Sequence, residues 1–291
     1  ELGSRVAIKT ILPSLIGDER VLSRFRREVQ LARQITHPNV CRIFDLMEMP
    51  RSTGGKAYFL TMEFLDGEPL SARLRRGGAM PFSEAAPVLE QVIAGLDAAH
   101  RAGVVHRDVK SSNIFLSKDG AGRLRAVITD FGLARAHSDD SRISQTTKGS
   151  SVAIGTPAYL APEQVEGKSV SPASDQYSFG VVMYEMATGV QPYEGDSPLQ
   201  VAARRIKERP RPPRELKEGI PSRWEQAILR CLEYDPRDRF ADLQSVGEAL
   251  RGGLSVPYVR ITQAKRWGVW AAVAAVVLAG AAFLGSRLMR P

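Results

Sequence analysis

Cysteine is scarce in this sequence, and the two that are present form no pattern. Cys41 and Cys231 are the only cysteines among 291 residues, and neither belongs to a CxxC or histidine-rich motif. A disulfide-stapled domain and a zinc site built from Cys and His are therefore not indicated. We expect two buried free thiols in a reducing compartment.

Extremes of composition are also missing. Hydrophobic residues make up 43% and charged residues 25% of the chain, as in an ordinary globular protein, which excludes a mainly disordered or fibrous chain. The net charge is +8, with 40 basic against 32 acidic residues. A basic balance suits nucleic acid, an anionic membrane or phosphate ligands, and does not choose among them.

Long hydrophobic runs are absent except near the C-terminal end. The run WGVWAAVAAVVLAGAAFLG begins at Trp267 and contains 19 residues without a charge. At ~1.5 Å per residue this helix would be roughly 28 Å long, close to the thickness of a bilayer core. We predict a transmembrane helix at 267–286, between a juxtamembrane linker at 253–266 and a short tail at 287–291; a buried core helix is the alternative.

The order of the remaining patterns predicts an α+β architecture, with strands first and helices later. We expect a small strand-rich lobe at 1–66 and a larger helical lobe at 67–252. The periodicity predicts helices at about 19–35, 83–103 and 175–189. The last of these is apolar on every face and should be fully buried. The turn sequence KDGAGR, between two apolar runs, predicts a β-hairpin.

The N-terminal strand pattern contains a lysine of interest. Alternate residues of a strand share a face, so Val6 and Ile8 should point to a core, with Ala7 and Lys9 on the other side. A lysine beside a small alanine suits contact with phosphates under an adenine ring. Most strand lysines are simply solvated, so this signal is weak alone.

An acidic residue lies on the apolar stripe of the 19–35 helix. Glu28 precedes Leu31, Ala32 and Ile35 by three, four and seven residues, so it shares their face. A carboxylate there needs a cationic partner. Lys9 is the candidate; a rim pair with Arg24 is the alternative.

The strongest motif is HRDVKSSN at 106–113, which is followed by DFG at 130–132 and APE at 161–163. Asp108 can accept a proton from a hydroxyl, while Lys110 neutralises a phosphoryl group in transfer. Asn113 and Asp130 offer the oxygen ligands that Mg²⁺ prefers. One HRD triplet is common by chance, but this combination at these spacings is highly specific.

These motifs, with HPN, GTPAYLAPE, DQYSFG and DPRDRF in the same order, resemble the eukaryotic-type Ser/Thr protein kinases, of the membrane-anchored kind found in bacteria. The resemblance covers residues 1 to about 250. It implies transfer of the γ-phosphoryl group of ATP to Ser or Thr hydroxyls of proteins, with ATP and Mg²⁺. Lys110 and Thr156 fit the Ser/Thr type. A pseudokinase scaffold and a small-molecule kinase are the alternatives.

The resemblance also implies roles at matching positions. Lys9 would hold the α- and β-phosphates and pair with Glu28. The adenine would be surrounded by Ala7, Phe115, the gatekeeper Met62, and backbone groups of Glu63 and Leu65. Asp175 would brace the catalytic loop, and Glu163 would pair with Arg239.

Residues 130–163 match an activation segment rich in hydroxyl groups. We expect phosphorylation at Thr146, Thr147, Ser150 or Ser151 to order this segment through Arg107 beside Asp108. A merely flexible polar loop is the alternative.

The expected glycine-rich loop is not found upstream of Lys9, where eight residues contain only Gly3. We therefore expect a truncated small lobe without its first two strands.

The basic run at 204–219 reads as a solvated loop, with docking on acidic lipids as the alternative. No nucleic acid is expected as a partner. We expect a single-pass protein of the cell membrane with a cytoplasmic kinase domain; a dimer through that domain or through the transmembrane helix stays open.

Overall fold

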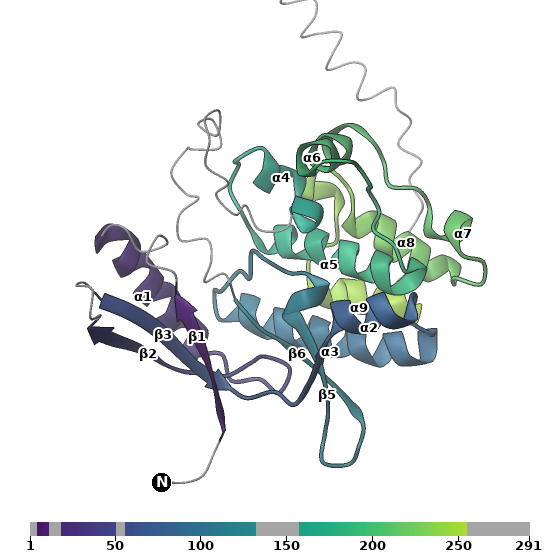
Figure 1. Cartoon of the computed structure of the whole chain (residues 1–291). Helices are drawn as coiled ribbons and strands as arrows, with labels where there is room; N and C mark the ends of the chain where they lie inside the picture. The colour runs from purple at the N-terminus through teal and green to yellow at the C-terminus, as the bar shows by residue number, and fades with distance from the viewer. Residues whose placement is uncertain (1–4, 12–18, 51–55, 132–156, 255–291) are drawn as a thin grey trace, which may run out of the picture. The chain divides into compact units, whose positions relative to one another are not determined.

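The computed structural model describes residues 5–11, 19–50, 56–131 and 157–254 (Figure 1). The predicted transmembrane helix, its linker beyond Leu254, the tail and the four activation-segment hydroxyls lie outside the described residues. Among the helices that are described, none has the length and apolar character needed to span a bilayer.

A three-stranded antiparallel sheet forms the N-terminal part. Its strand order is β1 (Val6–Ile11), β3 (Lys56–Glu63) and β2 (Ile43–Pro50). One amphipathic helix, α1 (Glu19–Arg33), lies beside this sheet (Figure 1) and buries Leu22, Phe25, Val29 and Ala32. The predicted helix at 19–35 is confirmed, and it ends two residues early.

The covered and exposed faces of β1 are the reverse of those predicted. Val6 and Ile8 are 46% and 64% exposed, so neither belongs to a core. Lys9 lies opposite Leu60, which is completely buried, and its face of the sheet is therefore the covered one. The alternation predicted from the sequence is correct, but periodicity does not say which face is covered. Within the described ranges, the sheet is covered on the Lys9 side.

The larger part is mainly helical, as predicted. Its helices are α2 (Leu70–Gly77), α3 (Phe82–Arg101), α4 (Pro162–Val165), α5 (Pro172–Thr188), α6 (Pro198–Lys207), α7 (Pro213–Leu216), α8 (Ser222–Cys231) and α9 (Leu243–Arg251). Short 3₁₀ turns occur at η2 (Ser111–Asn113), η4 (Pro157–Tyr159) and η5 (Pro236–Asp238). Helix α5 runs through the centre of this part, and every residue from Ser174 to Ala187 is buried. The prediction of a fully buried helix is confirmed.

A second antiparallel sheet, with the order β4 (Gly67–Pro69), β5 (Ile114–Lys118) and β6 (Leu124–Ile128), contains the predicted hairpin. The carboxylate of Asp119 accepts hydrogen bonds from the backbone N–H groups of Ala121 and Arg123, both at 2.9 Å, and so closes the turn. At the open end, the backbone N–H of Thr129 donates to the Asn113 carbonyl at 2.8 Å. The hairpin therefore brings the end of the HRDVKSSN motif next to Asp130.

Both cysteines are free and buried, as predicted. Burial raises the pKa of the Cys41 thiol to about 12, and it raises that of Cys231 as well. Neither thiol has the lowered pKa that marks a reactive cysteine.

Candidate active site

A buried carboxylate on α5 holds the loop that carries the HRD motif. Asp175 is 1% exposed and accepts hydrogen bonds from the backbone N–H groups of His106 and Arg107, each at 2.7 Å. The predicted brace is confirmed. His100 meets the same carboxylate, with its Nε2 at 2.7 Å from Asp175 Oδ2. Helical spacing shows that His100 faces inward, but not that it meets a residue 75 positions away.

The buried ring of His106 links the loop to the end of β6. Its Nδ1 accepts a hydrogen bond from the Asp108 N–H at 3.2 Å, so its Nε2 is left to donate to the Thr129 carbonyl at 2.9 Å. The ring also packs against Phe131, with centroids 4.5 Å apart. His106 is thus a scaffold residue that couples the HRD and DFG motifs.

Backbone strain is concentrated at these two motifs. Arg107 (φ 66°) and Asp130 (φ 62°) are the non-glycine residues with positive φ in the described part of the chain. Such conformations cost on the order of 1–3 kcal/mol and persist where the surroundings impose them. The bonds to Asp175 hold this conformation at Arg107, and the carboxylate of Asp130 is engaged by Lys9.

Three of the predicted catalytic and metal-binding residues lie together. Lys110 Nζ is 2.7 Å from Asp108 Oδ2. Asn113 Nδ2 donates to the backbone carbonyl of Asp108 at 2.9 Å and to its Oδ2 at 3.1 Å. These bonds orient the Asp108 carboxylate and leave the oxygen of the Asn113 amide as the end that can bind a cation.

The ion pairs around Lys9 differ from the prediction. Lys9 Nζ lies 2.7 Å from Asp130 Oδ1, while Glu28 Oε1 accepts a hydrogen bond from Arg107 Nη1 at 2.9 Å. The predicted Lys9–Glu28 pair is therefore wrong in this structure. The helical pattern shows that Glu28 faces inward, but two cations lie in that direction. The left-handed backbone at Asp130 brings its carboxylate to Lys9, and Glu28 pairs with Arg107.

The residues predicted to surround adenine occupy the junction between the two sheets. Ala7 lies opposite Met62 in the β1–β3 pair, Phe115 belongs to β5, and residues 64–66, including Leu65, connect β3 to β4. The backbone N–H of Glu63 is already bonded to the Arg42 carbonyl at 2.9 Å. Its carbonyl accepts a weak contact from Cys41 Sγ at 3.8 Å, which leaves a lone pair that Glu63 can offer.

A magnesium site would depend on few protein ligands. In the ranges that the structure describes, no group of three His, Cys, Asp or Glu residues could hold a metal ion. The amide oxygen of Asn113 and the carboxylate of Asp130 are close together at the base of the hairpin. They fit the chemistry of Mg²⁺, which usually completes its octahedral shell with water and substrate phosphates.

Comparison with known proteins supports the same conclusion. The family model for the protein kinase domain matches residues 1–250. The chain belongs to the protein kinase family. Over 235 residues it is 37% identical to serine/threonine-protein kinase PknB of Mycobacterium leprae, which covers 81% of the chain and 36% of that relative. Over 239 residues it is 38% identical to serine/threonine-protein kinase PknA of Mycobacterium tuberculosis, covering 82% of the chain and 53% of the relative.

A solved kinase structure supports the fold. The crystal structure of the Mycobacterium tuberculosis PknI kinase domain is similar with a TM-score of 0.64 at 24% identity, over 86% of each chain. This confirms the predicted two-lobed kinase fold of the α+β class. The chain spans only about a third to a half of the length of the two curated relatives, at 36% and 53%.

The predicted APE ion pair of the kinase domain is confirmed. Arg239, whose side chain is fully buried, donates from Nη1 to Glu163 Oε1 at 2.8 Å and from Nη2 to Oε2 at 2.9 Å. Burial raises the pKa of the Glu163 carboxyl, but the bonds and charge of Arg239 outweigh it and hold that pKa below 4.5.

A buried hydroxyl network joins the catalytic loop to the segment before APE, and no sequence signal pointed to it. Tyr159 Oη lies 2.8 Å from Ser111 Oγ and donates to the Glu185 carboxylate at 2.7 Å. Burial raises the pKa of the Glu185 carboxyl and that of the Tyr159 hydroxyl. In addition, Gln164 Nε2 donates to the Arg107 carbonyl at 3.1 Å. The segment 157–164 is thereby attached to the loop that carries Asp108.

The basic run at 204–219 is partly neutralised. Arg211 pairs with Glu215 at 3.2 Å, and Arg209 lies 3.5 Å from Glu233. Local pairing of this kind favours a solvated surface for these residues over a lipid-binding patch. The prediction of a solvated loop is wrong at Arg205, which belongs to α6 and is 2% exposed.

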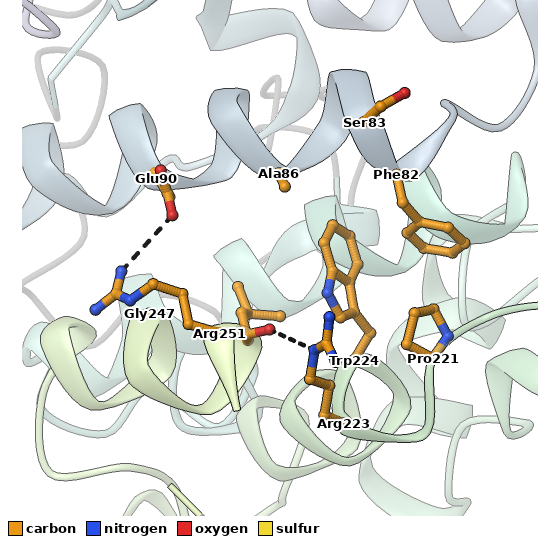
Figure 2. Close-up of a pocket in the computed structure, with 10 residues that line it drawn as sticks. Phe82, Ser83, Ala86, Glu90, Pro221, Arg223, Trp224, Gly247 and Arg251 are labelled. Atoms are coloured by element: carbon orange, nitrogen blue, oxygen red, sulfur yellow. Dashed lines mark hydrogen bonds and ion pairs between the residues drawn. The ribbon is translucent and has the colours of Figure 1, made fainter. Parts of the chain in front are cut away.

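A cavity of about 330 Å³ lies away from the catalytic loop. Figure 2 shows it between α3, α8 and α9, where Phe82 and Trp224 form an edge-to-face pair with centroids 4.8 Å apart. Arg251 reaches from α9 toward Glu90 of α3, at 3.8 Å. None of the predicted site residues lines this cavity, so it is separate from the kinase active site.

Proposed function

We propose that this chain is the catalytic domain of a serine/threonine protein kinase that transfers the γ-phosphoryl group of ATP to Ser or Thr hydroxyls of proteins. The observation that carries the proposal is the cluster of Asp108, Lys110 and Asn113, held by Asp175 next to Asp130. The similarity to serine/threonine-protein kinases supports the choice of a protein acceptor.

The chemistry follows from the positions of two carboxylates and two amines. Asp108 orients the acceptor hydroxyl and takes its proton while the oxygen–phosphorus bond forms and the bond to ADP breaks. Lys110, 2.7 Å from Asp108, neutralises charge on the phosphoryl group in transfer. Lys9, 2.7 Å from Asp130, holds the α- and β-phosphates. Asn113 and Asp130 would hold Mg²⁺, which would supply further neutralisation of the phosphates.

The adenine ring would bind at the junction of the two sheets. Ala7 and Phe115 would contact its faces, Met62 would close the back, and Glu63 and Leu65 would offer backbone groups. The Glu63 carbonyl suits this role because its N–H is already bonded within the small sheet.

Phosphoryl transfer by the full-length protein tests the proposal. With Mg-ATP and a generic basic protein as acceptor, Asp108→Asn should lower incorporation by about 10²–10⁴-fold, the usual contribution of a positioned base. Asp238→Asn is the matched control, because Asp238 is exposed and distant in sequence from the motif. Equal incorporation by wild type and Asp108→Asn would trace the activity to a contaminating kinase and refute the proposal.

Regulation by phosphorylation of the segment 132–156 is part of the proposal. Arg107, beside Asp108, is bonded to Glu28 at 2.9 Å. A phosphate at Thr146, Thr147, Ser150 or Ser151 carries about −1.5 to −2 charges and would compete with Glu28 for Arg107. Changing the four hydroxyl residues to Ala should lower the rate of the full-length protein; an unchanged rate would contradict this part.

Membrane attachment through 267–286 is proposed on sequence grounds alone, with the kinase domain in the cytoplasm where ATP is supplied. Deleting this segment should move the protein from the membrane pellet to the supernatant after an alkaline wash. Retention in the pellet would contradict the anchor.

A further inference from the structure

A buried arginine on α6 has no assigned role. Arg205 is 2% exposed, and its planar guanidinium reaches two backbone carbonyls of the segment before APE. Nη1 donates to the Leu160 carbonyl at 2.6 Å and Nη2 to the Ala158 carbonyl at 2.5 Å. The rings of Tyr177 and Tyr193 lie about 6 Å from the guanidinium carbon, at 5.9 and 5.8 Å. Burying a permanent charge is costly, and the two charge-assisted bonds offset that cost only in this geometry.

Arg205 and a second buried side chain together fix one short stretch of backbone. The carbonyl between its two acceptors, that of Tyr159, accepts a hydrogen bond from Ser178 Oγ on α5 at 2.8 Å. Three consecutive carbonyls, at 158, 159 and 160, are therefore held by buried side chains rather than by regular secondary structure. Ala158 and Leu160 themselves remain partly exposed, so the fixed backbone forms a surface.

This surface adjoins the acceptor side of the site. Tyr159 is bonded to Ser111 of the catalytic loop at 2.8 Å, three residues from Asp108. Within the described part of the chain, the groups assigned to nucleotide and metal, Lys9 and Asp130, pair with one another and not with this stretch. Residues 158–160 therefore adjoin the loop that carries Asp108, to which the acceptor hydroxyl must come.

We propose that Arg205 is a positioning residue for the protein acceptor: by clamping the carbonyls of Ala158 and Leu160, it fixes the wall against which the residues flanking the reacting hydroxyl bind. This inference rests on the proposed kinase function and assigns part of its acceptor site. The clamp acts on the binding of the acceptor and not on that of the nucleotide. Its loss should therefore raise KM for the peptide acceptor and leave KM for ATP nearly unchanged.

Steady-state kinetics on the full-length protein test the proposal, with one peptide acceptor and Mg-ATP varied in turn. Arg205→Gln should raise KM for the peptide about tenfold and change KM for ATP less than about twofold. Arg205→Lys keeps the charge but not the two-pronged geometry, and should recover part of the loss. Arg204→Gln is the matched control: Arg204 is the adjacent, exposed arginine, and its bond to the Glu194 carbonyl lies away from this surface.

A second variant covers the case in which Arg205→Gln does not fold. Ser178→Ala removes the donor to the Tyr159 carbonyl, together with a bond inside α5 to the Ser174 carbonyl. It should raise KM for the peptide about threefold, again without a matching change for ATP. An unchanged peptide KM in Arg205→Gln and Ser178→Ala, or a parallel rise of both constants, would overturn the inference while wild-type transfer stands. Wild-type protein that transfers no phosphoryl group would instead overturn the proposed function itself.

Discussion

Replacing Arg239 with methionine tests how the buried ion pair stabilises the helical part of the kinase domain. The Arg239 side chain is fully buried, and Glu163 is 5% exposed. After Arg239→Met, the Glu163 carboxylate would remain buried with the Ser174 hydroxyl as its donor, at 2.8 Å. The arginine also donates to three backbone carbonyls, those of Ala173, Glu233 and Tyr234.

The expected loss follows from leaving a buried charge without its partner. Removing one member of a buried pair costs about 3–5 kcal/mol. We therefore expect the free energy of unfolding, measured by denaturant titration, to fall by about that amount in Arg239→Met. Arg237→Met is the matched control: Arg237 is 88% exposed and pairs with Asp235 on the surface, so its loss should cost less than about 1 kcal/mol.

Two further measurements separate the charge from the shape of the side chain. Replacing both partners, in Arg239→Met with Glu163→Leu, should recover part of the loss because no charge is left buried. The pKa of Glu163 is held below 4.5, so the stability from the pair is present above that pH and is lost as pH falls through the lowered pKa. The difference between wild type and Arg239→Met should shrink in acid. A change below about 1 kcal/mol at neutral pH would refute the reasoning.

Two more predictions follow from the buried carboxylates of α5. Asp175→Ala leaves the N–H groups of His106 and Arg107 without their acceptor, so we expect a loss of about 3–5 kcal/mol in denaturant unfolding and loss of phosphoryl transfer; unchanged activity would contradict the brace. Burial raises the pKa of Glu185, so its stability contribution is greatest below pH 4.5 and is lost as pH rises through the raised pKa. The unfolding free energy of wild type relative to Glu185→Gln should therefore fall as pH rises from below 4.5 through the raised pKa, and a difference independent of pH would count against a raised pKa.

Much of the site could be predicted from the sequence because the residues that carry its chemistry belong to short motifs. Asp108, Lys110 and Asn113 lie within six residues of one another, so local geometry alone brings them together. The turn KDGAGR then predicts the hairpin, and the hairpin carries Asp130 back to Asn113. The apolar character of α5 on every face likewise predicts that the helix is buried, and the resemblance to kinases implies the brace at Asp175.

Other features depend on contacts between distant segments, which periodicity does not specify. The sequence shows that Glu28 faces inward, but only the packing of α1 against the catalytic loop decides that it meets Arg107 rather than Lys9. It shows that β1 alternates, but only the position of α1 decides that the Lys9 face is covered and Ile8 exposed. Arg205 stands in a basic run that looks solvated, yet tertiary structure buries it. In each case the local pattern sets which way a side chain points, and the partner comes from a segment that the chain brings near only on folding.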